Sequence, residues 1–301
     1  MKSLLDAFPG LGTLWWIDVE DALSHERMVM LKGLVIAQMK NFEETYSRFK
    51  ETSLLSTLNR EKFIEDAPDE FIDMLMRSQR YERMTRGLFS IAVGGVLERL
   101  GYGLTGDTTL PLPQQLPSIE SFLTIDHHTV RIDNSIRIDL GGIGKAYLIE
   151  RLADSIRSNG VKEFLINGGG DILVESSTEL HIEIEHPTNP ELSIASIPIT
   201  HGAICTSSPF KRAWKGEGNI KRQHIIHPHH TQETADTFQE SATVRAPTTV
   251  DADVFATVCV LLGSKRWDEI AELAPLFHAD VLLCSGAGIA HASENIHSTI
   301  H

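Results

Sequence analysis

Residues 139–147 read Asp-Leu-Gly-Gly-Ile-Gly-Lys-Ala-Tyr, and the hydrophobic pattern of the chain changes on either side of this stretch. Before it, residues 130–133 and 135–139 alternate apolar and polar side chains, which predicts two short strands around a turn. After it, apolar side chains at helical spacing predict a helix that ends at Gly160. The glycines therefore lie where a strand passes into a helix.

This junction has the chemistry of an anion site. The first turn of a helix exposes N–H donors, and Lys145 adds a positive charge beside them. The stretch is not a Walker A loop, because Asp139 stands at the required glycine and Ala146 replaces the metal-binding Ser or Thr. It is not a dinucleotide fingerprint, because Tyr147 stands at the third glycine. A tight turn capped by Asp139, with no ligand, is the alternative.

The order of the predicted elements indicates the fold class. An amphipathic helix is expected within residues 20–47 and a second between Pro68 and Gly87, with a polar loop from Lys50 to Asn59 between them. The segments expected to be extended are 163–167, 171–174, 180–185 and two stretches within 192–206. A loop-like segment, 223–245, precedes a buried helix at 250–262. Helices followed by strands with one embedded helix predict an α+β or mixed α/β fold.

Composition excludes several classes of protein. The 301 residues carry a net charge of −14, which disfavours binding to nucleic acid through its phosphates. Hydrophobic residues make up 42% and charged residues 23%, so the chain can bury a core and is not mainly disordered. No apolar run reaches the roughly 18 residues of a membrane span.

The N-terminus and the cysteines favour a cytoplasmic protein. Asp6 and Pro9 interrupt the N-terminus before an apolar stretch typical of a signal peptide can form. The three cysteines are Cys205, Cys259 and Cys284; their odd number and wide spacing suggest neither a disulfide framework nor a zinc knuckle. We therefore expect a reducing compartment and no membrane partner.

Asp253 and Thr257 are candidate metal ligands. They are four residues apart on the predicted buried helix, so they lie one turn apart on the same face. A carboxylate and a hydroxyl suit Mg²⁺ better than Zn²⁺. The surrounding segment is nearly apolar, and a buried carboxylate needs a partner. The alternative is an acid in the first helical turn and a Thr that bonds back to a helix carbonyl, with no metal.

Two further segments are candidates for a site. In Asn167-Gly-Gly-Gly-Asp171, glycines without a Cβ would let a planar ligand approach, although a hairpin with a glycine bulge has the same pattern. In the loop-like segment, His224, His227, His229 and His230 could bind zinc or supply a single general base. No cysteine or second acidic residue nearby completes a zinc ligand set.

In this order, these segments resemble the ApbE-type FAD:protein FMN transferase family between Gly12 and Gly263. The segments that carry the resemblance are Leu11-Gly-Thr13, Tyr46-Ser-Arg-Phe-Lys-Glu-Thr-Ser-Leu-Leu-Ser-Thr-Leu-Asn59, Gly87-Leu-Phe-Ser-Ile-Ala-Val-Gly94, residues 139–147, Gly169-Gly-Asp-Ile172, Thr206-Ser207, His224-Ile-Ile-His-Pro228 and Ala252-Asp-Val-Phe-Ala-Thr257.

The resemblance implies a mixed α/β fold with two lobes around a flavin-binding cleft, with residues 1–301 as a single domain. It implies Mg²⁺-dependent transfer of FMN from FAD onto a Thr or Ser hydroxyl of a partner protein, with release of AMP. Asp253, Thr257 and the backbone carbonyl of Gly142 would hold Mg²⁺, and His224 would be the base for the acceptor hydroxyl. The residues that would contact FAD are Leu11, Phe89, Ser90, Asp139, Lys145, Gly169, Gly170 and Thr206.

The chain departs from the family pattern at several of these positions. Leu11 replaces a Met, Ser90-Ile-Ala replaces Asp-Pro-Thr, Ala146 replaces a Gly, and His227 replaces an Asp. An FAD pyrophosphatase that releases FMN and AMP, a non-catalytic flavin-binding protein and a zinc hydrolase built on the histidine loop are therefore the competing hypotheses.

Overall fold

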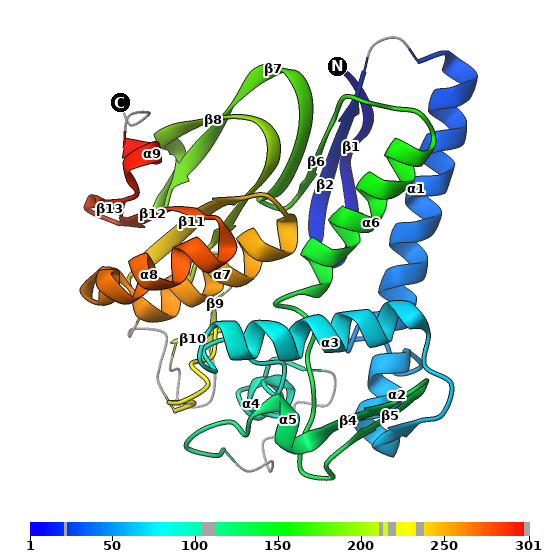
Figure 1. The fold of residues 1–301 in the computed structure, drawn as a ribbon, viewed down its shortest axis with the longest axis vertical. Coiled ribbons are helices and arrows are strands. Elements are labelled where there is room, and N and C mark those ends of the chain that lie inside the picture. Colours follow the sequence, from blue (N-terminus) through cyan, green and yellow to red (C-terminus); the bar gives the residue numbers. More distant parts are fainter. Residues whose placement is uncertain (21–22, 104–111, 211–212, 216–220, 233–237, 298–301) are drawn as a thin grey trace. The chain divides into compact units, whose positions relative to one another are not determined.

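The structure is a computed structural model, and it describes residues 1–20, 23–103, 112–210, 213–215, 221–232 and 238–297 (Figure 1). The chain forms two compact units, and each is built from segments that are far apart in the sequence. The first unit comprises Met1–Glu43, Lys145–Ser208 and Glu240–His301; the second comprises Glu44–Gly144 and Pro209–Gln239.

An eight-stranded sheet organises the first unit, in the order β1-β2-β6-β7-β8-β11-β12-β13. Every neighbouring pair in it is antiparallel. The strands are β1 (Lys2–Gly10), β2 (Thr13–Val19), β6 (Phe164–Gly168), β7 (Asp171–His186), β8 (Asn189–Ser207), β11 (Glu240–Ala246), β12 (Asp280–Ser285) and β13 (Gly288–Ala292).

Helices pack on this sheet and bury its apolar side chains. They are α1 (His25–Tyr46), which continues into the second unit, α6 (Gly144–Ser158), α7 (Thr249–Leu262), α8 (Trp267–Leu273) and α9 (Glu294–His297). Short 3₁₀ turns, Ser264–Arg266 and Ala274–Phe277, flank α8. Helix α7 is apolar on nearly all sides and packs against β8 and β11, as expected for a buried helix.

The second unit contains short helices and two small sheets. Its helices are α2 (Leu54–Glu61), α3 (Asp69–Met84), α4 (Gly94–Arg99) and α5 (Ile119–Phe122). One sheet has the order β3-β5-β4, from Phe63–Ile64, Thr129–Ile132 and Leu123–Asp126; the other pairs β9 (Ala213–Lys215) with β10 (Lys221–Gln223). The mixed fold class and the helices predicted at 20–47, after Pro68, before Gly160 and at 250–262 are confirmed.

The predicted loop from Lys50 to Asn59 is wrong, because helix α2 begins within it. Ser53 caps this helix by accepting a hydrogen bond from the Ser56 N–H at 3.0 Å. Leu55 and Leu58 are buried, which anchors so short a helix in the unit.

The predicted strand at 135–139 is also wrong. Asp133 accepts from the N–H and hydroxyl of Ser135, which closes a turn. In residues 136–138, side chains make the hydrogen bonds that a neighbouring strand would otherwise make with the backbone. Asn59 bonds the N–H and the carbonyl of Ile138, and Lys62 donates to the carbonyl of Ile136. The hairpin at this place is instead β4–β5.

The later strands are longer than predicted. Segments 171–174 and 180–185 belong to one strand, β7, because the polar residues between them stay extended through a register shift opposite β8. The two strands expected within 192–206 are likewise one strand, β8. The end of the loop predicted at 223–245 forms β11, while residues 233–237 of that loop lie outside the described residues.

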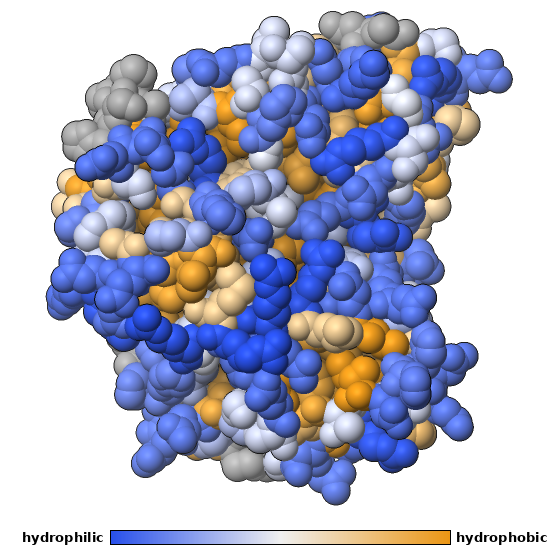
Figure 2. All heavy atoms as spheres, viewed as in Figure 1, coloured by the Kyte–Doolittle hydropathy of each residue, from blue (hydrophilic) through white to orange (hydrophobic). Residues whose placement is uncertain are grey.

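Figure 2 shows polar side chains over most of the viewed face, with apolar side chains in smaller patches between them. None of the helices described by the structure has the length and apolar character needed to cross a membrane.

We predict that Ser53→Ala lowers the free energy of unfolding by about 1 kcal/mol, because it removes the cap of α2. Chemical denaturation of the full chain measures this change. Ser118→Ala is the matched control, since Ser118 precedes α5 without a side-chain cap bond. Equal stabilities of the two variants would contradict the capping role.

Candidate functional site

Asp139 is held within its own turn in the second unit. One carboxylate oxygen accepts the Gly141 N–H at 2.8 Å, and the other pairs with the Nε of Arg48. The Asp139 N–H donates to the Ile91 carbonyl at 2.8 Å. These contacts are those of the capped turn, which was the alternative to a ligand site, and any contact with FAD would have to be made alongside them.

Arg48 is a residue that sequence reasoning missed. It is only 7% exposed, and besides pairing with Asp139 it donates from Nη1 to the Tyr102 carbonyl at 2.8 Å. Its guanidinium lies 4.4 Å from the ring centroid of Phe49 and 5.0 Å from that of Tyr102. No spacing in the sequence links Arg48 to Asp139, so only the fold could reveal this pair.

Phe89 and Gly142 lie together in the second unit. A Cβ on Gly142 would be 3.4 Å from the Phe89 ring. Phe89 is 4% exposed and packs edge-to-face against Tyr81, with ring centroids 6.2 Å apart. The Phe89 ring therefore has little surface left for a ligand.

Ser90, next in the chain, faces a cavity of about 380 Å³ in the second unit. Its hydroxyl accepts the Ala92 N–H at 3.2 Å. The cavity is also lined by Arg86, Glu82 and His229, and burial raises the pKa of the Glu82 carboxyl. Ser90 is thus a predicted contact residue that lines a cavity in this unit.

The histidines of the loop pack against one another. His224 is half-buried, whereas His227 is 6% exposed and its ring centroid lies 4.8 Å from that of His230 and 5.8 Å from that of His229. Among the described residues, no group of three or more His, Cys, Asp or Glu side chains is arranged to hold a metal ion. The zinc hydrolase hypothesis gains no support from this arrangement.

In the first unit, the turn between β1 and β2 leads to Thr13, which lies against Gly169 of the β6–β7 turn. Leu11 has φ +49° in the turn between β1 and β2. Gly169 has φ +70°, and a Cβ there would lie 2.1 Å from the Thr13 hydroxyl, so only glycine fits. Gly170 donates its N–H to the Asn167 side chain at 2.9 Å.

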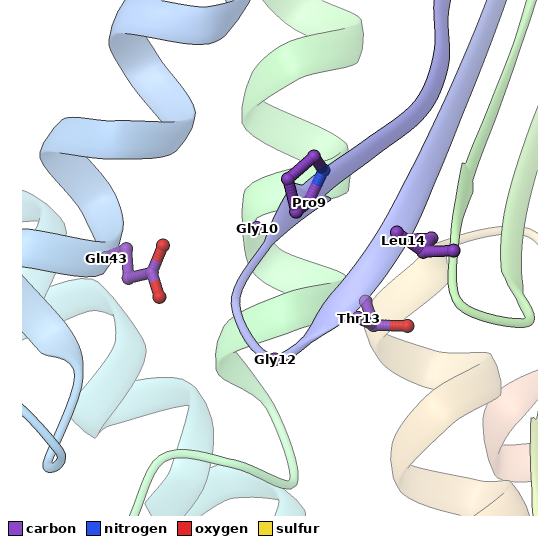
Figure 3. Close-up of a pocket in the computed structure, with 6 residues that line it drawn as sticks. All are labelled: Pro9, Gly10, Gly12, Thr13, Leu14 and Glu43. Atoms are coloured by element: carbon purple, nitrogen blue, oxygen red, sulfur yellow. The ribbon is translucent and has the colours of Figure 1, made fainter.

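A hollow of about 530 Å³ borders the turn between β1 and β2 (Figure 3). Figure 3 shows the carboxylate of Glu43 directed from α1 toward the turn between β1 and β2. The residues that line the hollow are Pro9, Gly10, Gly12, Thr13, Leu14 and Glu43. A ligand here would meet the glycine backbone, the side chains of Pro9, Thr13 and Leu14, and the carboxylate of Glu43.

Lys145 forms an ion pair with Asp171, which sequence reasoning did not single out. Lys145 is in the first turn of α6, and Asp171 is the first residue of β7. Asp171 is 2% exposed. A carboxylate buried this deeply is stable only beside a positive charge, so the pair fixes the ammonium of Lys145 at the start of β7.

The end of β8 lies beside the Lys145–Asp171 ion pair in the first unit. Cys205 is opposite Asp171 in the β7–β8 register. Burial raises the pKa of the Cys205 thiol well above its usual range, the charge of Asp253 raises it further, and the charge of Lys145 lowers it. The Cys205 thiol also donates to the Thr249 carbonyl at 3.6 Å, so the start of α7 lies against this end of β8.

Hydroxyl pairs flank this thiol. Thr206 bonds Thr243 on β11 at 2.9 Å between their oxygens, and Ser207 bonds Thr257 on α7 at the same distance. The first unit thus gathers Lys145, Thr206, Asp253 and Thr257 at one end of β8.

The donor atoms on α7 are suitable for magnesium. Asp253 is 8% exposed and is the one charged residue from Ala252 to Leu262. Thr257 is half-buried, whereas the other residues in that range are buried. A single carboxylate with a neighbouring hydroxyl matches the way proteins bind Mg²⁺, which keeps most of its shell for water and phosphate oxygens. Gly142, the third predicted ligand, belongs to the second unit.

We predict that Asp171→Asn lowers the free energy of unfolding by about 3 kcal/mol, because it leaves the Lys145 ammonium without its carboxylate. Asp280→Asn is the control, since the Asp280–Arg245 pair of the same unit is more exposed. Thermal or urea unfolding should show a smaller loss, about 1 kcal/mol or less, in the control. A loss in Asp171→Asn no larger than in the control would argue against the pair.

We also predict that a thiol reagent at pH 8 labels none of the cysteines in the folded protein and all of them after denaturation. Cys205, Cys259 and Cys284 are buried, and burial raises the pKa of all three, that of Cys284 to about 12. Mass spectrometry after labelling measures the outcome. Rapid modification of Cys205 in the folded state would contradict its placement beneath α7.

Comparison with known proteins identifies the family of this chain. The model of the ApbE family matches residues 11–279. The FAD:protein FMN transferase of Escherichia coli K12 is 23% identical over 279 residues, covering 86% of this chain and 78% of that protein. The FAD:protein FMN transferase of Salmonella typhimurium is 24% identical over 279 residues, covering 86% and 79%.

Solved structures show the same fold. The ApbE protein of Thermotoga maritima superposes with a TM-score of 0.83 at 21% identity, covering 97% of each chain. The flavin transferase ApbE of Vibrio cholerae gives a TM-score of 0.75 at 21% identity and the same coverage. With the family match over residues 11–279, these findings show that the chain belongs to the ApbE family.

Proposed function

We propose that this protein is a Mg²⁺-dependent FAD:protein FMN transferase that moves FMN from FAD onto a Thr or Ser hydroxyl of a partner protein and releases AMP. The observation that supports this most is the gathering of Lys145, Thr206, Asp253 and Thr257 at one end of β8. The relatives reported above are named for the same reaction.

Asp253, Thr257 and the carbonyl of Gly142 would hold Mg²⁺. When bound, the ion would supply positive charge that offsets the pyrophosphate and the departing AMP. The oxygen donors of Asp253 and Thr257 suit this ion.

The chain's own residues would bind and orient the substrates. Lys145 would place its ammonium against the pyrophosphate, and positioning of this kind carries most of the catalysis in phosphoryl-type transfer. His224 would take the proton of the acceptor hydroxyl. The acceptor oxygen would then bond the FMN phosphorus while the bond from that phosphorus to the AMP oxygen breaks.

The remaining predicted contacts would hold the flavin nucleotide. They are Leu11, Phe89, Ser90, Asp139, Gly169 and Gly170. Because these residues come from both units, we propose that the two units work as one functional domain over residues 1–301.

The defining experiment incubates the full chain with FAD, MgCl₂ and candidate acceptor proteins. Chromatography measures AMP, and in-gel fluorescence measures covalent flavin on the acceptor. AMP together with a flavin-labelled acceptor would support the transferase, and replacing the acceptor Thr or Ser by Ala should abolish labelling. AMP without labelling of any acceptor would support the FAD pyrophosphatase instead. FAD binding without AMP would support a flavin-binding protein.

We predict that Asp253→Asn lowers Mg²⁺-dependent AMP release by about 100-fold or more, because it removes the one carboxylate of the proposed ion site. The substitution preserves shape, so thermal unfolding should show a folded protein. EDTA should inhibit the wild type, and zinc should not restore it, because the ligands are oxygen atoms.

Asp251→Asn is the matched control on the same helix. Asp251 accepts a hydrogen bond from the Thr248 hydroxyl at the start of α7. Its replacement changes the charge equally and should leave AMP release within about twofold of the wild type. Full activity in Asp253→Asn would remove this residue from the ion site.

A further inference from the structure

We infer that Ser207 is a positioning residue that orients the Thr257 hydroxyl for a divalent cation. This inference rests on the proposed function, in which Thr257 is a ligand of Mg²⁺. The observation that carries it is the 2.9 Å contact between the Ser207 and Thr257 hydroxyl oxygens.

Thr257 does not make the bond usual for a Thr inside a helix. A Ser or Thr in a helix often donates to the carbonyl four residues earlier. Ser78 and Thr85 do so in this protein, donating to Met74 and Tyr81 at 2.7 and 2.8 Å. Within the described residues, the Thr257 hydroxyl bonds Ser207 and makes no bond with a carbonyl of α7.

The place of Thr257 on α7 suits a ligand. Every other residue from Ala252 to Leu262 is buried, and Thr257 alone is half-buried. Asp253 lies one turn earlier on the same face. A carboxylate and an accessible hydroxyl are thus brought together on a helix whose other positions in this range are apolar.

The chemistry of a hydroxyl ligand explains why a neighbour is needed. A hydroxyl has one proton and two lone pairs. When a lone pair faces a cation, the proton must point away and needs an acceptor, because a buried donor without one is costly. In the arrangement we infer, Ser207 Oγ, 2.9 Å away, accepts this proton and leaves the Thr257 lone pairs for the ion. Partners of this kind orient metal ligands in other proteins.

The fold holds Ser207 in place. It is the last residue of β8 and lies opposite Ala242 of β11, so the sheet register fixes its backbone. Helix α7 packs on the same two strands. The distance between the two hydroxyls is therefore set by the sheet and by the helix that packs on it.

The test measures cation binding directly. Mn²⁺, which also prefers oxygen ligands, is titrated into the full chain with saturating FAD, and the free ion is counted by electron paramagnetic resonance. Mg²⁺ affinity follows from competition. We expect Ser207→Ala and Ser207→Cys to weaken the binding of both ions about tenfold, because neither offers a good acceptor. Ser207→Thr keeps the hydroxyl and should stay within about twofold of the wild type.

Ser196→Ala is the matched control on the same strand. Ser196 donates to Glu183 at 2.7 Å far along β8, so the same substitution there should leave cation affinity unchanged. Thermal unfolding of every variant separates stability from binding. A lower melting temperature of Ser207→Ala with unchanged cation affinity would show a structural role and overturn the inference.

The outcomes also separate this inference from the proposed function. A wild type that binds no Mn²⁺ in the presence of FAD would overturn the magnesium site, and the role of Ser207 with it. A wild type that binds Mn²⁺ while Ser207→Ala and Ser207→Cys bind it equally well would overturn the role of Ser207 alone.

Discussion

The packing of an apolar helix against the end of a long strand is the constraint on which the first unit depends. Helix α7 buries nearly all of its side chains, so its rotation about its axis and its height along β8 are fixed by contacts on every side. Asp253 and Thr257 have no freedom independent of that packing. The polar corner at the end of β8 is therefore a consequence of the core, and loosening the core would displace the proposed ion ligands.

One buried and one half-buried carboxylate show how the chain places charge inside each unit. Asp171 pairs with Lys145 in the first unit, and Asp139 pairs with Arg48 in the second. Each pair offsets the loss of water around its ions, although a buried pair contributes little net stability compared with apolar residues of the same shape. These pairs are better understood as fixing orientation. Each joins a residue of the glycine-rich stretch 139–147 to a segment distant in the sequence.

Sequence patterns predict local elements well, but they do not reveal contacts between segments that are far apart in the sequence. Helices α1 and α6 could be predicted because apolar side chains repeat at helical spacing within each, and α7 because its apolar run is long enough for a buried helix. Residues 135–139 alternate apolar and polar side chains as a strand would. Their backbone groups are instead hydrogen-bonded by the side chains of Asn59 and Lys62, which no local pattern reveals. Helix α2 was missed because only two of its residues, Leu55 and Leu58, are buried, which is too few to show a helical repeat in the sequence.

The same limit applies to the candidate site. The chemistry of single residues and the family motifs both pointed to Asp253, Thr257 and Lys145. Asp171 and Ser207 stand in the same motifs, but nothing in the sequence shows that Asp171 pairs with Lys145 or that Ser207 bonds Thr257. The Ser207–Thr257 bond joins residues 50 positions apart, so it is a property of the fold. Partners of ligands are found only when strands and helices are assembled.

The two residues that stand where the family motifs have Asp, Ser90 and His227, have one structural feature in common. Ser90 stands where the family has Asp, and its hydroxyl accepts the N–H of Ala92, two residues on, at 3.2 Å. His227 also stands where the family has Asp, and its Nδ1 accepts the N–H of His229, again two residues on, at 3.2 Å. An Asp side chain characteristically makes this bond, which closes a turn. Ser90 and His227 therefore close such turns without a negative charge, which favours an anionic ligand in the second unit.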